Sequence, residues 1–317
     1  MSRILLTAIG SMAAAPAARR YQALGHTVFG CDIYPREWTA LAGELDFFQA
    51  RLATEGEPYV EQLREAVRRD RLDFLIPLTD PEVDALAPRK AEFRALGCTV
   101  CVPEERVAAL CRRKDKMNRF LAEKQVCRLI PTESAVPGQP CPFPFPVIIK
   151  PRSGRSSMGQ AVAADEKNYQ TALAGREDCI VQPFLEGDVF CVDVARDSAG
   201  QVRAAARQEL LRNKSGLGMT VEVLPDHPLE AVCAAIAEAV GLVGVVNMEF
   251  IRHGDDFFFL EVNPRFSGGV GFSMAAGMDF AEMMLCCHSC GSVEAFPAAP
   301  KHALLAREST IVLTQLR

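Results

Sequence analysis

The stretch FFFLEVNPRFSGGVG (residues 257–271) places a row of polar side chains at the end of an apolar strand. Side chains alternate between the two faces of a strand, so Glu261, Asn263 and, if the extended backbone continues, Arg265 point the same way. The four residues before Glu261 are large and apolar, as in a buried strand. A carboxylate, an amide and a guanidinium on that face therefore indicate a binding or catalytic site.

A second carboxylate lies on the apolar segment that precedes this strand. VVNMEFI (residues 245–251) and FFFLEVN are connected through HGDD, which predicts a β-hairpin. A three-residue loop with a bulge would place Glu249 directly opposite Glu261, whereas an even-numbered loop would pair Glu249 with Leu260. Two adjacent carboxylates repel unless a cation lies between them. With Asn263 they form an all-oxygen site, which suits Mg²⁺ better than zinc or copper.

KPRSGRSSMG (residues 150–159) has the composition of a phosphate-binding loop. A hard cation held by carboxylates usually has phosphate oxygens among its ligands, so such a loop is expected near the metal site. Lys150 closes an apolar strand, and because this lysine precedes the glycines and no G-K-[ST] follows, the loop is not a Walker sequence. The small residues whose backbone amides can approach an anion are Gly154, Ser156, Ser157 and Gly159.

Length and charge limit the classes of protein that the chain can be. With 317 residues, 49% of them hydrophobic, the chain can bury more than one core, and roughly two domains are expected. A net charge of -5 with interspersed signs argues against a nucleic-acid or membrane-surface partner. The N-terminal apolar run is too short for a secretory signal, and no window approaches a membrane span. We therefore expect a cytoplasmic protein with small-molecule partners.

The twelve cysteines do not form a zinc-binding pattern. Cys98 and Cys101 lie on an apolar run that is typical of a strand, where residues three apart face opposite sides. Cys287 and Cys290 could share a helix face, but no second ligand pair follows them at zinc spacing. The interpretation favoured by the sequence is scattered buried thiols in a reducing compartment.

Strands alternate with helices over the first third of the chain, including helices over 59–69 and 81–96, which predicts a parallel, doubly wound sheet. Only Gly10 is present where a dinucleotide fingerprint needs three glycines, so Asp32 is interpreted as a polar strand end rather than a ribose ligand. Beyond the Pro-rich segment 136–146, antiparallel strands with fewer helices predict an α+β part. The expected fold class is thus α/β followed by α+β.

Four motifs in a fixed order carry a resemblance to a known family: KDKMNRF (114–120), VIIKPRSG (147–154), VQPFLEG (181–187) and LEVNPRFSGG (260–269). In their order and spacing the sequence resembles the ATP-grasp superfamily, and most of all stand-alone proteins similar to one ATP-grasp half of the carbamoyl-phosphate synthetase large subunit. The resemblance covers nearly the whole chain, including a strand-like ending over 303–316.

The resemblance implies a Rossmann-like pre-ATP-grasp domain over residues 1–110 and a two-lobed ATP-grasp domain over 111–317. The small lobe would span about 115–180 and the large lobe about 181–317. ATP would be gripped between the lobes. The boundary near residue 110 coincides with the change from alternating elements to a basic segment.

The activity implied by the resemblance is Mg²⁺-dependent, ADP-forming ligation of a small-molecule carboxylate to an amine through an acylphosphate. ATP and Mg²⁺ would be the cofactors, Mn²⁺ could replace Mg²⁺, and a homodimer is left open. Two other classes use the same arrangement of cations: an ATP-dependent phosphotransferase without ligation, and a non-catalytic nucleotide-binding regulatory subunit. Phosphoryl transfer needs mainly metal ions and well-placed cations, so the sequence alone does not separate them.

The resemblance also implies roles for particular residues. Lys116 and Lys150 would contact the ATP phosphates, although Lys116 could instead belong to a merely basic helix start. Arg265 would lie over the transferring phosphoryl group, with Lys150 as its catalytic partner. The metal ligands would be Glu249, Glu261 and Asn263. The loop with Gly154, Ser156, Ser157 and Gly159 would cover the phosphates.

The remaining implied roles concern the nucleoside and the second substrate. Gln182 and the backbone of Pro183 and Phe184 would meet adenine. Alignment through Gly187 gives the ribose position to Val189, so the neighbouring Asp188 is the acidic candidate for the ribose. In the glycine-rich loop, Met158 stands where relatives commonly carry a basic residue, and Arg155 could substitute. Candidates for the anionic end of a second substrate are Arg207, Arg212, Lys214, Gly268 and Gly269; the three basic residues could instead form a solvated charged run.

Overall fold

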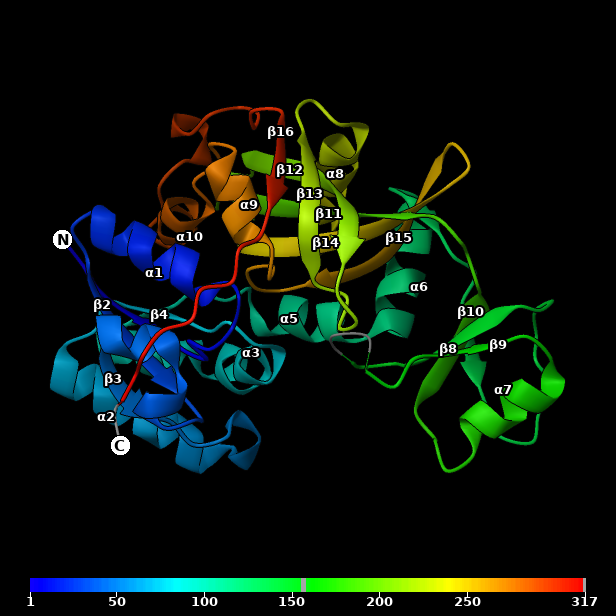
Figure 1. The fold of residues 1–317 in the computed structure, drawn as a ribbon, viewed down its shortest axis with the longest axis horizontal. Coiled ribbons are helices and arrows are strands. Elements are labelled where there is room, and N and C mark those ends of the chain that lie inside the picture. Colours follow the sequence, from blue (N-terminus) through cyan, green and yellow to red (C-terminus); the bar gives the residue numbers. More distant parts are fainter. Residues whose placement is uncertain (155–157, 316–317) are drawn as a thin grey trace.

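The computed structural model describes residues 1–154 and 158–315, and its N-terminal part is a parallel sheet in the order β3-β2-β1-β4-β5 (Figure 1). Ile4 and Leu6 on β1 pack toward helix α1, whereas Leu5 packs toward α2 and α3, so the central strand is buried on both faces. The strands are β1 (Arg3–Leu6), β2 (Thr27–Asp32), β3 (Asp46–Gln49), β4 (Phe74–Ile76) and β5 (Thr99–Val100). The helices are α1 (Ala14–Ala23), α2 (Glu57–Asp70), α3 (Asp80–Leu86) and α4 (Lys90–Ala95).

Short 3-10 turns complete this part of the chain, and two predictions can be compared with it. The turns are η1 (Arg36–Trp38), η2 (Ala40–Glu44), η3 (Ala53–Glu55) and η4 (Ala87–Arg89). Asp32 is a structural strand end, as predicted, because its carboxylate accepts hydrogen bonds from the N–H groups of Gly10 at 2.8 Å and Tyr34 at 3.1 Å. The single helix predicted over 81–96 was wrong, since η4 interrupts it at Pro88, which has no N–H to donate.

The small lobe is built on an antiparallel sheet in the order β7-β10-β8-β9. Alternate residues of β8, Val147 and Ile149, pack with Tyr169 and Leu173 of the covering helix α7. The elements are β7 (Glu133–Ala135), β8 (Val147–Pro151), β9 (Ala161–Ala163), α7 (Glu166–Leu173) and β10 (Cys179–Pro183).

The large lobe is a seven-stranded sheet in the order β16-β13-β12-β11-β14-β15-β6, with helices on both faces. Val192 and Met248 pack toward α8 on one face, and Ala195 and Val245 pack toward α10 on the other. The strands are β6 (Arg128–Leu129), β11 (Asp188–Arg196), β12 (Val202–Arg212), β13 (Gly218–Leu224), β14 (Gly244–His253), β15 (Asp256–Asn263) and β16 (Ala303–Ala306). The helical elements are α5 (Glu105–Arg112), α6 (Lys114–Lys124), α8 (Pro228–Val240), α9 (Val270–Ala275), α10 (Phe280–His288) and the 3-10 turn η5 (Val293–Ala295).

The N-terminal sheet and the large lobe share one hydrophobic core, whereas the small lobe extends to the side (Figure 1). Helices α1 and α10 pack together, and the Tyr21 hydroxyl donates a hydrogen bond to the carbonyl oxygen of Ala281 at 2.8 Å. This arrangement fixes the carboxyl ends of β1 and β4 opposite the β14–β15 hairpin. The predicted fold class, α/β followed by α+β in two lobes, is confirmed.

Three elements differ from the expected outline. Helix α5 crosses residue 110, and it packs Ala108 on the N-terminal core but Val107 on the core of the seven-stranded sheet. Strand β6 lies within the expected small lobe but pairs with β15 of the large lobe. The strand predicted over 303–316 ends at Ala306, where its pairing with β13 ends. Within the described residues, no helix has the length and apolar content needed to span a membrane.

Gly187→Ala is expected to destabilise the protein strongly, by about 2 kcal/mol or more, because there is no room for a side chain. A Cβ atom added at Gly187 would lie 1.7 Å from the carbonyl oxygen of Arg252, across the start of the β11–β14 pair. Gly43→Ala is the matched control, since nothing lies within 4 Å of its added Cβ. Thermal unfolding would compare the two variants, and equal midpoints would contradict the expectation.

Candidate active site

The two carboxylates lie side by side on the β14–β15 hairpin. Glu249 is paired with Glu261, as one of the two sequence alternatives predicted. The loop that produces this pairing differs from the three-residue loop expected. His253 pairs with Asp256, so the loop has two residues, and this loop alone would pair Glu249 with Leu260. A register shift between Glu249 and the next residue of β14 leaves Leu260 as the extra residue of a bulge. The bulge therefore restores the carboxylate pair.

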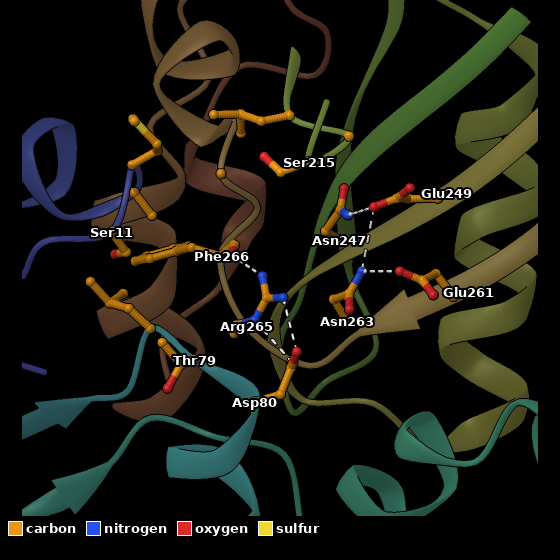
Figure 2. A pocket seen from close by; sticks show the side chains of 16 residues that line it. Ser11, Thr79, Asp80, Ser215, Asn247, Glu249, Glu261, Asn263, Arg265 and Phe266 are labelled. Atoms are coloured by element: carbon orange, nitrogen blue, oxygen red, sulfur yellow. Dashed lines mark hydrogen bonds and ion pairs between the residues drawn. The ribbon is translucent and has the colours of Figure 1, made fainter. Parts of the chain in front are cut away.

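Amide groups hold the carboxylates in place, as Figure 2 shows. The Asn263 amide donates to Glu261 Oε1 at 3.1 Å and to Glu249 Oε1 at 3.5 Å, and Asn247 donates to Glu249 Oε1 at 3.1 Å. Arg212 Nη2 lies 3.7 Å from Glu249 Oε2. The side chains of Glu249 and Glu261 are each about a fifth exposed, so they can still reach a ligand in the cavity.

The protonation of the two carboxylates is set by burial and by their different neighbours. Burial, together with the neighbouring charge of Glu261, raises the pKa of Glu249 to about 7. Burial also acts to raise the pKa of Glu261, but Lys114, Asn263 and Lys150 together outweigh it, and the pKa of Glu261 is lowered. Glu261 is thus the more acidic member of the pair.

Two lysines face Glu261, and one of them is not the lysine that the sequence nominated. Lys114 Nζ lies 2.7 Å from Glu261 Oε2. Lys150 is buried at the end of β8, and burial lowers its pKa to about 8 despite the nearby Glu261. Lys116 lies on the exposed side of α6, so its phosphate contact stays a prediction. Helix α6 begins at Lys114. Because side chains two residues apart point to different sides of a helix, Lys114 faces the carboxylates and Lys116 does not.

Arg265 lies in the same cavity as the carboxylates but does not continue the strand, which ends at Asn263. Its guanidinium forms a two-point ion pair with Asp80 at the start of α3, with distances of 3.0 and 3.1 Å (Figure 2). Arg112 Nη1 lies 3.6 Å from the same Asp80 carboxylate, which is fully buried. Asp80 therefore orients the predicted catalytic arginine, and no local pattern in the sequence predicts this contact.

The cavity lies between the face of the hairpin that carries Glu249 and Glu261 and the carboxyl ends of β1 and β4, with a volume of about 330 Å³. Glu261 and Arg265 line it from the large lobe, and Thr79 and Asp80 line it from the N-terminal part (Figure 2). Lining residues that the sequence did not nominate are Ser11, Met12, Ala13, Leu78, Thr79, Asp80, Ser215, Gly216, Leu217, Asn247 and Phe266. Most come from distant segments or short loops, which local patterns do not bring together.

The candidates for a second substrate fall into two groups. Arg207 is 1% exposed and bonds to Asp193 at 2.7 Å and Glu209 at 3.3 Å, so it is neither a solvated charge nor an accessible anion site, and both interpretations of it were wrong. Gly269 packs directly on its guanidinium. Gly268 lines the cavity, so it stays a candidate for contact with the second substrate. Arg212 is half-buried and Lys214 is exposed beside the cavity loop.

Only some of the loop residues predicted to bind the nucleotide phosphates can be placed at one site. Ser156 and Ser157, like Arg155, lie outside the described residues. Gly154 lines a second, smaller pocket with Lys114, Lys150 and Glu261, and Met158 lines it too. Gly159 has a φ of 71°, which favours glycine, and its carbonyl oxygen accepts a hydrogen bond from Arg176.

The residues predicted to contact adenine and the residue nominated for the ribose have different outcomes. Gln182 is buried on β10, and its amide donates to the Thr132 hydroxyl at 2.8 Å. Pro183 and Phe184 continue from β10 toward the large lobe, so contact of these residues with adenine stays a prediction. Asp188 pairs with Arg252 and shares its strand face with Phe190, which packs toward α8. Because Glu249 lies on the other face, Asp188 was wrongly nominated for the ribose.

The residues of the hairpin fit a hard divalent cation. Two adjacent carboxylates and the carbonyl oxygen of Asn263 are suitable oxygen ligands, provided that the Asn263 amide turns its Oδ1 toward the cation. The Oδ1 atom of Asn247 is buried without a hydrogen-bond partner in the same cavity, so a further acceptor is available. Among the described residues, no cluster of three or more His, Cys, Asp or Glu side chains could hold a metal ion, so a site here depends on amide oxygens.

Comparisons with known proteins agree with this fold. A family model described as ATP-grasp in the biosynthetic pathway with Ter operon matches residues 175–310, which include the carboxylate pair and Arg265. The formate-dependent phosphoribosylglycinamide formyltransferase of Synechococcus sp. (strain CC9605) is 27% identical over 275 residues, covering 77% of this chain and 64% of that protein. The chain spans less than two thirds of the length of the curated relatives it matches.

Solved structures with the same fold are similar over nearly the whole chain. The biotin carboxylase–β,γ-ATP complex from Campylobacter jejuni superposes with a TM-score of 0.72 at 17% identity, covering 92% of this chain and 72% of that one. The L-amino acid ligase from Bacillus licheniformis superposes with a TM-score of 0.71 at 14% identity, covering 90% and 73%. The chain therefore has the fold of the ATP-grasp superfamily, as its motifs predicted. The finer likeness to carbamoyl-phosphate synthetase stays a prediction.

Glu249→Gln is expected to stabilise the metal-free protein considerably more at pH 8 than at pH 5. With a folded-state pKa of about 7 against an ordinary value of 4.5, ionised Glu249 costs folding free energy above pH 7, and this cost disappears as the pH falls. Glutamine removes the charge, so its advantage at pH 8 should be roughly 1–3 kcal/mol. Urea unfolding with a chelator would measure it.

The matched control for that experiment is Glu238→Gln, at an exposed position of α8. This variant should change the unfolding midpoint little at either pH. An advantage of Glu249→Gln that is equal at both pH values would show that ionisation of Glu249 is not its cause.

Proposed function

We propose that this protein is an ATP- and Mg²⁺-dependent, ADP-forming ligase that joins a small carboxylate to an amine through an acylphosphate. The observation that carries the proposal is the position of Glu261 between two pockets. On one side it faces Lys114, Lys150 and Gly154. On the other side it lines the larger cavity with Arg265. A nucleotide phosphate chain and a second reactant would thus meet at one carboxylate pair.

Each charged group has a task in such a reaction. Glu249, Glu261 and Asn263 would hold Mg²⁺, and Mn²⁺ would fit the same oxygen ligands. Mg²⁺ supplies charge neutralisation between phosphate oxygens when it is bound. Lys150, held at the end of β8, would place a positive charge on the phosphates. Arg265, fixed by Asp80, would stabilise the negative charge that develops on the transferring group.

The proposed chemistry consists of two displacements. An oxygen of the substrate carboxylate attacks the γ-phosphorus, the bond to the β-phosphate oxygen breaks, and ADP leaves. The amine nitrogen then attacks the acyl carbon, the acyl–phosphate bond breaks, and the amine loses a proton as inorganic phosphate departs. No side chain needs to act as a covalent nucleophile, so none of the twelve cysteines has a role in it.

The comparisons support ligase-type chemistry in different ways. One similar structure is described as an L-amino acid ligase, and one similar sequence as a formate-dependent formyltransferase. Both names are consistent with activation of a carboxylate. They do not identify the carboxylate and amine that this chain uses, and assembly as a homodimer stays part of the proposal.

A non-catalytic nucleotide-binding subunit is the second candidate function. It is favoured by the ribose position, where Val189 stands and the neighbouring Asp188 faces the opposite side of the sheet. It is opposed by the complete set of Glu249, Glu261 and Arg265, since a site without turnover has no chemical need of them. A phosphotransferase that stops before ligation would use the same residues.

ADP release is the measurement that tests the proposed function. Purified protein with ATP and Mg²⁺ is given pools of amino acids and small carboxylic acids, and substrate-dependent ADP release is expected. Glu261→Ala should reduce the rate by about 100-fold or more, because it removes a ligand and leaves the lysines unpaired. Glu238→Ala, on the other face of the large sheet, is the matched control and should retain the rate.

Product analysis separates the three classes. Hydroxylamine should capture an acylphosphate as a hydroxamate, and mass spectrometry should detect an amide when the amine is present. ADP without either product would favour a phosphotransferase acting on another acceptor. Nucleotide binding without ADP release in any pool would favour the regulatory subunit.

A further inference from the structure

The side chain of Lys114, the first residue of helix α6, forms an ion pair with Glu261. Lys114 Nζ lies 2.7 Å from Glu261 Oε2, and the two side chains are 11% and 20% exposed. The other oxygen, Oε1, accepts a hydrogen bond from Asn263. Both oxygens of Glu261 therefore already have a partner, and a cation that binds through Oε2 would compete with the ammonium group for this oxygen.

The ion pair meets an electrostatic need of the site. Glu249 and Glu261 face one another across the hairpin, and Arg212 Nη2 lies 3.7 Å from Glu249 Oε2. A partly buried carboxylate pair without a nearby cation would be strongly unfavourable. Lys114 supplies that charge in the structure as it stands.

The surroundings of Lys114 also place it where phosphates would enter. It lines the smaller pocket with Lys150, Glu261 and Gly154. Its backbone N–H donates to the carbonyl oxygen of Arg152 at 3.0 Å, and Arg152 in turn binds Asp115 at 2.9 Å. The start of α6 is thus fixed to the end of β8, while the ammonium group has only Glu261 as its ion-pair partner among the described residues.

We propose that Lys114 is a tethered counter-ion that exchanges partners during nucleotide binding. While the metal site is empty, its ammonium group neutralises Glu261 and competes with divalent cations. When a metal–nucleotide complex binds, the Lys114 ammonium group leaves Glu261 and forms an ion pair with a phosphate oxygen next to Lys150. The inference rests on the proposed function, because it takes Glu261 as a metal ligand. It assigns to Lys114 the phosphate contact that the sequence assigned to Lys116.

The test uses two ligands on which the substitution Lys114→Met should act in opposite directions. Without nucleotide, binding of Mn²⁺ measured by electron paramagnetic resonance should become about fivefold tighter or more, because the competing charge is gone. Binding of a non-hydrolysable ATP analogue with Mg²⁺, measured by calorimetry, should become about tenfold weaker, because a charge-assisted hydrogen bond is lost. Lys114→Gln should give the same two changes and guards against a packing artefact of Met.

Two matched variants separate this exchange from a general effect of charge. Lys116→Met and Lys124→Met each remove one positive charge from exposed positions of the same helix. Neither should change Mn²⁺ affinity by more than about twofold, because neither contacts Glu261 and solvent screens their charges. In a Glu261→Gln background, Lys114→Met should no longer tighten Mn²⁺ binding. Unchanged or weaker Mn²⁺ binding by Lys114→Met in the wild-type background would overturn the proposal.

These outcomes do not depend on turnover. Tighter Mn²⁺ binding with no ligase product would support the counter-ion while contradicting the proposed reaction. Ligase activity together with unchanged Mn²⁺ affinity in Lys114→Met would do the reverse.

Discussion

Repulsion between two carboxylates on one face of a buried hairpin is the constraint on which this site depends. Glu249 and Glu261 are brought together by the register of β14 and β15, and the energy of that arrangement requires cations nearby. Lys114 on α6 forms an ion pair with Glu261, and Lys150 adds a second positive charge from the small lobe. Two segments that are separate in the sequence thus supply positive charge to the hairpin.

The features that could be predicted from the sequence are those with a local period. Alternation of strands and helices gave the parallel N-terminal sheet, and a period of two placed Glu261 and Asn263 on one face. The order of four motifs predicted the fold of the ATP-grasp superfamily. Pairing of Glu249 with Glu261 was one of two stated alternatives, and the turn alone would have selected the other.

The rest depends on contacts between distant segments. The bulge at Leu260 has no sequence signature, because it is a choice of hydrogen-bond partners rather than of residue type. Arg207 looked like part of a charged run, and only the pairing of β11 with β12 reveals that Asp193 and Glu209 enclose it. Lys114 and Lys116 are equally basic in sequence, and the residue at which α6 begins decides which one faces Glu261.

The ion pair between Asp80 and Arg265 joins two segments that are made far apart in time during synthesis. The two residues are 185 positions apart, so most of the protein must be made before Arg265 can reach its partner. Arg112 also lies near the Asp80 carboxylate and belongs to α5, only 32 positions from Asp80, so a nascent N-terminal sheet already carries a cation for that carboxylate. The cavity is therefore completed only when the β14–β15 hairpin and the segment with Arg265 pack against the N-terminal part.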